Sequence, residues 1–367
     1  MTDWRATVAS AAWRDAVGAR DRTIDYRVEA VTTAGAHVGW VPVDGVRISY
    51  RGTQTEAWGA DFAFSDPALV PYSPAGWLDG RSGVRLRVWW RLHTPDSILE
   101  VPVCTLVVED PQGTDDGILS GTVPGLDPLA VARRGGYGPR TISVGGMTVT
   151  DALTALFDAL VPGWPLAIEP TTITLPAVYD LWDREPSEDW TEIAALAGMV
   201  VRTDREGTIT VARPASGGLV ADWSEGPGCP VLALAWEQKT STIPRQVVAV
   251  TTNPDVTPPL VGVWVHPDAA AMDIITETRV ESSTVTTQDA ADSLARLTGQ
   301  RWARRQVAVT ATIPQRPDLD YRDTVSVVRP LSQLHGLFEV SGWDLTLSGP
   351  DSPPDPMQVH LMTRLEG

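Results

Sequence analysis

The chain has 367 residues, of which 43% are hydrophobic, and a formal net charge of −17 at pH 7. This length suffices for two or three domains with real cores, and the acidic balance disfavours nucleic-acid binding, because the attraction to phosphates that dominates such binding would be reversed. No run of about 18 apolar residues exists to span a membrane, and charged residues break the apolar core that a secretory signal needs within residues 1–20. We therefore expect the chain to be made and to fold in a cytoplasm.

Residues 1–20 suggest a short amphipathic helical segment, with Trp4, Val8, Trp13 and Val17 as its expected contacts. A strand-rich region follows over residues 21–124. Turn residues separate its strands at intervals of roughly 8–15 residues, the rhythm of an antiparallel barrel or sandwich. The predicted strands are 26–32, 46–50, 57–64, 84–92, 99–108 and 117–123. In strand 84–92 apolar residues alternate with Arg85, Arg87 and Arg91, so we predict one face in the core and a cationic face toward an acidic neighbour.

Residues 125–214 form a mixed α/β middle region. Gly145-Gly146 indicates a two-residue hairpin turn between residues 142–144 and 147–149, and Thr150 is predicted to cap a helix that Pro162-Gly163 ends. The apolar stripe of that helix consists of Leu153, Leu156, Phe157 and Leu160.

Residues 186–214 read as a second helix followed at once by a tight hairpin. Ser187 is predicted to cap the helix, Gly198 to end it in a left-handed conformation, and residues 204–207 (DREG) to form the hairpin turn. The helix has one apolar stripe, Trp190, Ile193, Ala194 and Ala197. We expect this stripe to pack on the adjoining hairpin, so the unit is a structural module without chemistry of its own.

Residues 215–218 form a linker, and residues 219–367 form a second strand-rich region. Its predicted strands are 231–236, 246–252, 261–265, 273–281, 306–313, 324–328, 337–347 and 357–364. Thr287 opens its one predicted helix, over about residues 288–304, with arginines at the C-terminal end where the helix dipole favours cations.

The usual catalytic signatures do not occur in the sequence. A phosphate-binding loop needs a lysine after its glycines, and the sole lysine, Lys239, is not so placed; neither G-x-S-x-G nor H-E-x-x-H is present. Cys104 and Cys229 lie far apart without metal or redox spacing, and we expect both to stay reduced. Residues 133–140 (RRGGYGPR) are predicted to be a flexible loop.

Two groups of carboxylates remain as candidates for chemistry. Asp318, Asp320 and Asp323 superficially resemble a calcium loop, but the central glycine and distal glutamate are missing, so a solvated turn is favoured. The second group, Asp183, Glu185, Glu188 and Asp189, could include an acid and base pair for glycoside hydrolysis, but two of its members are better explained as first-turn helix residues. We assign no catalytic, cofactor-binding or metal-binding residue, and we expect no enzyme activity.

The fifteen tryptophans leave two interpretations open. Single tryptophans on strands are usually core residues or interface anchors, and less often sugar-stacking platforms. The alternative function is accordingly a secreted carbohydrate-binding or carbohydrate-active protein.

Three stretches, in this order, resemble the tail hub proteins of long-tailed bacteriophages, which are often called minor tail proteins in phages of actinobacteria. They are residues 40–92, residues 143–164 with 187–214, and a C-terminal run that contains IPQRPDLDYRDTVSVV (313–328) and GLFEVSGWDLTLS (336–348). The family often has Gly-Asp before the strand at 324–328, where this chain has Arg322-Asp323.

The resemblance implies a β-rich α+β fold, with two antiparallel β-barrel-like domains flanking a small α/β region, as in phage baseplate hub proteins. It implies a homotrimer in which six barrels form a ring between tail tube and tail tip, and a structural virion protein that lines the DNA exit channel for genome ejection. The implied partners are the distal tail protein, the tape measure protein and tail fibre or tip proteins, with no specific nucleic-acid binding and no cofactor.

Overall fold

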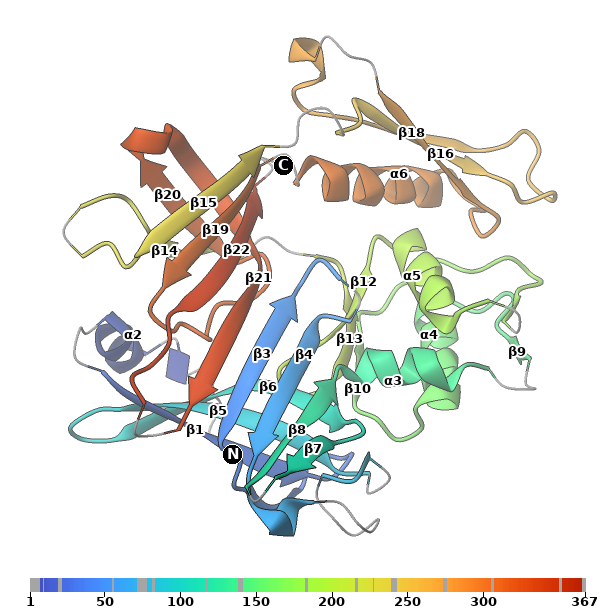
Figure 1. Cartoon of the computed structure of the whole chain (residues 1–367). Helices are drawn as coiled ribbons and strands as arrows, with labels where there is room; N and C mark the ends of the chain where they lie inside the picture. The colour runs from blue at the N-terminus through green and yellow to red at the C-terminus, as the bar shows by residue number, and fades with distance from the viewer. Residues whose placement is uncertain are drawn as a thin grey trace.

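The computed structural model describes residues 7–8, 10–18, 22–54, 56–70, 78–80, 83–116, 118–137, 141–181, 184–214, 217–226, 228–238, 243–272, 276–304, 307–349 and 352–364. Its fold is β-rich with few helices and a large antiparallel sheet, as predicted (Figure 1). Among these described residues, no helix is both long and apolar enough to cross a membrane.

One 14-stranded sheet runs through both strand-rich regions. Strand β3 of the first region pairs antiparallel with β21 of the second, from Gly45↔Ser348 to Arg51↔Gly342. The first region contributes β1 (Thr23–Val31), β2 (His37–Val41), β3 (Gly45–Arg51), β4 (Trp58–Phe64), β5 (Arg85–His93), β6 (Ile98–Val108), β7 (Gln112–Asp115) and β8 (Leu119–Leu126). The second contributes β14 (Leu219–Asp222), β15 (Ala233–Gln238), β19 (Val307–Ile313), β20 (Thr324–Arg329), β21 (Leu334–Ser348) and β22 (Met357–Thr363). One hydrophobic core spans both regions.

The N-terminal segment adds helix α2 (Ala11–Gly18) to this core. Its Trp13 is buried and meets Trp90 of β5 edge to face, with ring centroids 5.6 Å apart. Trp4, a further predicted contact of this helix, lies outside the described residues.

Strand β5 has the two faces that its alternation predicts. Leu86, Val88 and Trp90 are buried in the core. On the other face Arg91 pairs with Asp25 of β1 at 3.1 Å and with Glu100 of β6 at 3.0 Å. Arg85 differs from the prediction, because it is buried with its guanidinium 4.1 Å from the ring centroid of Trp164 in the middle region. Only part of the cationic face therefore meets carboxylates, and these come from the adjacent strands.

The middle region is built from three helices and two small sheets. The helices are α3 (Pro128–Gly135), α4 (Val149–Leu160) and α5 (Pro186–Leu196). The sheets are β10 (Leu166–Ile168) with β13 (Ile209–Ala212) and β12 (Val200–Thr203), and β9 (Ile142–Ser143) with β11 (Asp180–Leu181).

The helix–hairpin unit forms at 186–212, although its cap differs from the prediction. Ser187 does not cap α5: the N-cap is Glu185, and the helix begins at Pro186, two residues earlier than a Ser187 cap implies. Proline suits the first position because the N–H that it lacks would have no partner within the helix. Gly198 is left-handed (φ 66°), and its N–H donates to Ala195 O at 2.9 Å while the next N–H, of Met199, reaches Ala194 O, the pattern of a Schellman end. The apolar stripe contacts more than its own hairpin, because Trp190 stacks on Phe157 of α4 at 5.4 Å.

Two local predictions at 142–160 are corrected. The cap of α4 is Thr148, whose Oγ1 accepts from Asp151 N at 3.1 Å, whereas Thr150 lies inside the first turn. The turn at Gly145-Gly146 forms, but its arms do not pair with each other: β9 pairs with β11, and Thr148 bridges to Thr174. The chain on both sides of the turn therefore pairs with residues 173–181.

A separate α/β unit lies beside the middle region in Figure 1. It consists of the sheet β17 (Val261–Val265), β16 (Gln246–Thr251) and β18 (Glu277–Ser282), and of α6 (Gln288–Ala303), for which Thr287 is the N-cap. Its buried residues share a second core with α3, α4, α5 and the hairpin. Glu192 of α5 reinforces this contact by accepting from the hydroxyls of Ser282 and Thr284 at 2.7 and 3.0 Å.

Candidate functional site

The turn of the 200–212 hairpin is inserted between the two strand-rich regions. Arg205, predicted as a polar turn residue, is 2% exposed. Its guanidinium donates to the carbonyl oxygens of Pro317 and Leu319, the latter at 2.9 Å, and to Oδ1 of Asp320. Its own carbonyl accepts from Thr105 Oγ1 of β6 at 2.9 Å. The hairpin tip therefore fastens the middle region to both strand-rich regions.

The segment 317–323 that receives Arg205 is not the solvated turn that we predicted. Asp318 is held by Nε and Nη2 of Arg316, both at 2.8 Å, Asp320 binds Arg205, and Asp323 accepts from the backbone N–H of Asp320 at 2.7 Å. These carboxylates therefore serve internal contacts, and among the described residues no cluster of His, Cys, Asp or Glu could hold a metal ion.

The departure at residue 322 also has a structural meaning. Arg322 has φ 67°, a conformation that favours glycine, and the resembling family often has glycine there. The side chain is buried, where it pairs with Glu339 at 3.2 Å and donates to Pro214 O at 2.6 Å. These contacts offset the backbone strain of a non-glycine residue at this position.

An aromatic cluster on the large sheet contacts both the hairpin and the 317–323 segment that binds Arg205. Tyr50, Trp58 and Trp343, from the adjacent strands β3, β4 and β21, lie within 4.2–5.6 Å of one another by ring centroid. Trp58 Nε1 donates to Thr203 O and Trp343 Nε1 to Leu319 O, both at 3.0 Å. Half of the twelve tryptophans that the structure describes are buried in this way: Trp13, Trp58, Trp90, Trp190, Trp223 and Trp343. These six are core residues rather than sugar-stacking platforms.

Asp127 forms a second contact between the first strand-rich region and the hairpin, and the sequence analysis did not predict it. Its buried carboxylate accepts from Ala57 N, Trp58 N and Leu129 N at 2.8–3.1 Å and from Thr203 Oγ1 at 2.6 Å. Burial raises the pKa of Asp127 to about 6, against the effect of these four donors. The sequence signal was present, because Asp127-Pro128 is a helix-start pattern.

Helix α3, which begins at Pro128, corrects the predicted flexible loop at 133–140. Arg133 to Gly135 are its last residues, and Gly136 follows with φ 54°. Residues 138–140 lie outside the described part of the chain.

The second carboxylate group lies around the start of α5. Glu188 pairs with Arg184 at 3.4 Å, and Glu185 lies 3.5 Å from Arg133. Asp189 is buried and accepts from the hydroxyl of Tyr137 at 2.5 Å, a contact the sequence did not suggest. Burial raises the pKa of Asp189 overall, although Tyr137 and Arg184 act to lower it. Asp183 is outside the described residues.

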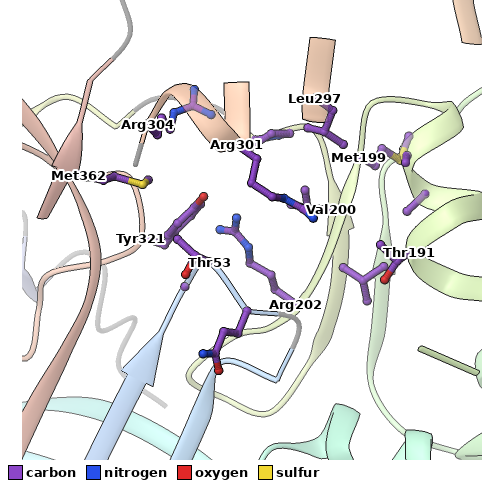
Figure 2. A pocket seen from close by; sticks show the side chains of 16 residues that line it. Thr53, Thr191, Met199, Val200, Arg202, Leu297, Arg301, Arg304, Tyr321 and Met362 are labelled. Carbon is purple, nitrogen blue, oxygen red and sulfur yellow. The ribbon is translucent and has the colours of Figure 1, made fainter. Parts of the chain in front are cut away.

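A small cavity of about 70 Å³ lies close to these joints. It is bounded by the turn after β3, α5, the hairpin, α6 and Tyr321. Figure 2 shows Arg202 and Arg301 reaching into the same space from opposite sides, with Tyr321 and Thr53 beside them. The charged residues among its described lining are thus cationic, whereas Met199, Leu297 and Met362 provide apolar walls.

The ends of the large sheet present open strands with exposed aromatic side chains. Strand β2 pairs only with β1, and β15 only with β19, among the described strands. Trp236 of β15 is opposite the buried Val309 and so points to the core face, yet it is 53% exposed. It lines a groove with Leu337 and Phe338. At the other end, Trp40 of β2 is 43% exposed.

In this β-rich fold, Arg205 and Asp127 join the middle region to the strand-rich regions, and the end strands β2 and β15 of the large sheet each lack a second neighbour among the described strands. Solved structures of phage tail proteins have a similar fold. The chain is similar over 92% of its length, with a TM-score of 0.67 and 17% identity, to a tail protein from Neisseria meningitidis MC58, of which it covers 97%. It is also similar to the 43 kDa tail protein of prophage MuSo2 from Shewanella oneidensis, with a TM-score of 0.63, 12% identity, and coverage of 94% of this chain and 98% of that one.

A third solved structure extends the likeness beyond phages. It is the E. coli c3393 protein, described as a type VI secretion component with structural similarity to the T4 tail proteins gp27 and gp5. The TM-score is 0.52 at 9% identity, with coverage of 89% of this chain and 75% of that one. No family model matches the sequence, and a search of curated proteins found no match. The chain therefore has the fold of phage tail proteins.

Proposed function

We propose that this protein is a structural component of a phage tail and forms the hub of the tail tip. The observation that carries the proposal is the similarity to tail proteins along nearly the whole of both chains, because a shared single domain would cover only part of each. The described residues add no competing site, since the candidate carboxylates are engaged in internal contacts.

The open edges support assembly into a ring. A ring with one interface per neighbour needs two different complementary surfaces on each subunit. Strands β2 and β15 occupy opposite ends of one sheet and expose Trp40 and Trp236, and large aromatic side chains are frequent anchors of interfaces. We propose a homotrimer, as the resemblance to hub proteins implies.

The charge supports a role as a channel for DNA. A net charge of −17 repels phosphates, so DNA would pass such a ring without being held. The proposed location is the virion tail tip, after synthesis in the host cytoplasm. The proposed partners are the distal tail protein, the tape measure protein and tail fibre or tip proteins of an actinobacterial phage.

Oligomeric state tests this proposal. We expect the full chain, alone or coexpressed with the tail proteins encoded beside it, to give trimers by native mass spectrometry and rings in negative-stain images. Trp236→Glu should abolish the ring, whereas Val178→Glu, at a site 81% exposed in the middle region, should not. Monomers under all these conditions, or rings that persist in Trp236→Glu, would contradict the proposed trimer interface.

The alternative function, carbohydrate binding or hydrolysis, can be tested with the same purified protein. It predicts saturable glycan binding that is lost when Trp40 or Trp236, the two tryptophans with the most exposed side chains among those described, is replaced by alanine. A glycan array and a hydrolysis screen on host cell-wall polysaccharide measure this directly. The burial of six of the twelve described tryptophans weakens the support for this alternative.

A further inference from the structure

The three-stranded sheet of β16, β17 and β18 is covered by helix α6 on one face. Gly262 and Trp264 of β17 point to the helix: a Cβ on Gly262 would lie 2.2 Å from Ala291 O, and a Cβ on Gly299 would lie 2.1 Å from the Trp264 ring. In Figure 1 α6 lies between this sheet and α5. The opposite face of the sheet is therefore turned away from the middle region.

This outer face has valines on two strands and charged residues on the third. The strand registers align its side chains in three rows, Val261–Val250–Glu281, Val263–Val248–Arg279 and Val265–Gln246–Glu277. The three valines of β17 are 45%, 53% and 54% exposed along the chain. Val248 and Val250 of β16 are partly buried and belong to neither hydrophobic core of the described residues. We call these five valines the valine face.

The fold by itself does not account for the valine face. A sheet with one solvated face usually has polar residues there, and β18 follows this rule with Glu277, Arg279 and Glu281. The high β-propensity of valine favours it in strands, but this preference would act on all three strands alike. A contiguous apolar patch with a polar rim is typical of a surface that contacts another molecule.

The charges on β18 oppose a second copy of this chain as the occupant. A two-fold contact centred on the middle row, with each strand stacked on its own copy, would set Arg279 opposite Arg279 and Glu277 opposite Glu281. Like charges across an interface disfavour binding. Arg279 already pairs with Glu281 at 3.2 Å, whereas Glu277 accepts from the neutral amide of Gln246. The rim thus has one negative charge in excess, in a chain with a net charge of −17.

We propose that the valine face binds a segment of a different protein, whose apolar side chains are flanked by lysine or arginine. The apolar side chains cover the valines, and the cations lie over β18, where Glu277 attracts them. The bound segment covers this face as α6 covers the other, which gives the sheet a layer on both sides. The inference rests on the proposed tail function only in its candidate partners, the tail proteins encoded beside this chain.

Coexpression of the full chain with each of these tail proteins, followed by purification and a binding titration of the pair, tests the valine face. We expect one of them to copurify with the wild type. Val263→Glu should weaken its binding by about tenfold or more, and Glu277→Lys by about tenfold. The matched controls are Val178→Glu, at a site 81% exposed in the middle region, and Glu225→Lys, at an exposed site in the second strand-rich region. Both controls should keep the wild-type affinity.

Oligomeric state distinguishes failure of this inference from failure of the proposed function. Val263→Glu should keep the wild-type Tm, because its site is exposed, and it should still form the trimers proposed above. Partner binding by a chain that stays monomeric would support the valine face and contradict the ring. Loss of the trimer in Val263→Glu would instead identify a second copy as the occupant and overturn the inference. An unchanged affinity in both Val263→Glu and Glu277→Lys, or no binding by any of the tail proteins, would also overturn it.

Discussion

The guanidinium of Arg205 lies 2.9 Å from Oδ1 of Asp320 by Nη2, and 3.0 Å by Nε. The two residues are 115 positions apart, and Arg205 sits at the tip of a hairpin that would be an exposed turn in isolation. The arginine is buried whereas the Asp320 side chain is 46% exposed. Removal of either residue consequently leaves a buried polar or charged group without its partner.

Arg205→Ala is expected to lower the free energy of unfolding by about 3–5 kcal/mol, because it removes a large buried side chain, leaves the carbonyl of Pro317 without the guanidinium donor, and takes from Leu319 O one of its two donors, the other being Trp343 Nε1. Asp320→Ala should also be costly, about 3 kcal/mol, since the buried guanidinium of Arg205 keeps its carbonyl partners but loses the carboxylate that compensates its charge. Urea unfolding measures both. The control is Arg213→Ala, which breaks the exposed pair with Glu169 and should cost less than about 1 kcal/mol. An equal loss of unfolding free energy in Arg205→Ala and Arg213→Ala would contradict the role of Arg205 in joining the middle region to the strand-rich regions.

Asp344 predicts how stability depends on pH at the seam between β3 and β21. Its carboxylate is bound by Arg51 of β3 at 2.8 Å and by Nε2 of His360 of β22 at 2.8 Å. Burial raises the pKa of Asp344, but the bonds from His360 and Arg51 outweigh it, so the pKa lies below its ordinary value. The unfolded carboxyl binds a proton more readily, and the stabilisation is therefore present above pH ~4 and lost as pH falls through the folded pKa.

Asp344→Asn should cost about 1 kcal/mol at pH 7, a small value because the pair is about one-third exposed. The difference between this variant and the wild type should shrink as pH falls through the lowered folded pKa of Asp344, because the wild-type side chain then becomes neutral as well. Urea unfolding at several pH values gives the comparison. Asp61→Asn, at an exposed position on the neighbouring strand β4, serves as the control. A cost that persists undiminished at low pH would rule out the ionised pair as its source.

Much of the fold was readable from alternation and helix signals. The β5 faces, the Gly198 end of α5 and the Thr287 cap of α6 were predicted from local sequence. Thr150 and Ser187 were wrong as caps because better starts lay just before them, a threonine at 148 and a proline at 186. Local rules identify helix ends to within a few residues, and neighbouring candidates compete.

The buried contacts of Arg205 and Asp127 could not be predicted, because they join segments that are far apart in the sequence. A DREG turn has the same local chemistry whether its arginine meets water or the 317–323 segment, and nothing in it signals burial. Asp127 was in principle accessible through Asp-Pro, but its bond to Thr203 joins residues 76 positions apart. The pairing of β3 with β21 is likewise set by register across nearly 300 positions.

Gly262 controls how closely α6 approaches its sheet. A Cβ at this position would lie 2.2 Å from the carbonyl oxygen of Ala291, which is helix backbone and cannot rotate aside. Gly262→Ala should therefore shift α6 and destabilise the chain by about 3 kcal/mol. Gly218→Ala is the matched control, because a Cβ there meets nothing within 4 Å. Equal midpoints in urea for the two variants would show that α6 does not lie this close to β17.

Two substitutions of Trp190 separate the stability that its ring contributes by packing from the cost of its unpaired N–H group. The ring is buried against Phe157 of α4, and its Nε1 has no hydrogen-bond partner among the described residues. Trp190→Ala should cost about 3–5 kcal/mol, because it leaves a cavity between α4 and α5. Trp190→Phe keeps most of the stack and removes the unsatisfied N–H, so it should cost less than about 1.5 kcal/mol. Urea unfolding followed by far-UV circular dichroism gives both values, and a phenylalanine variant as unstable as the alanine variant would mean that the indole N–H has a partner.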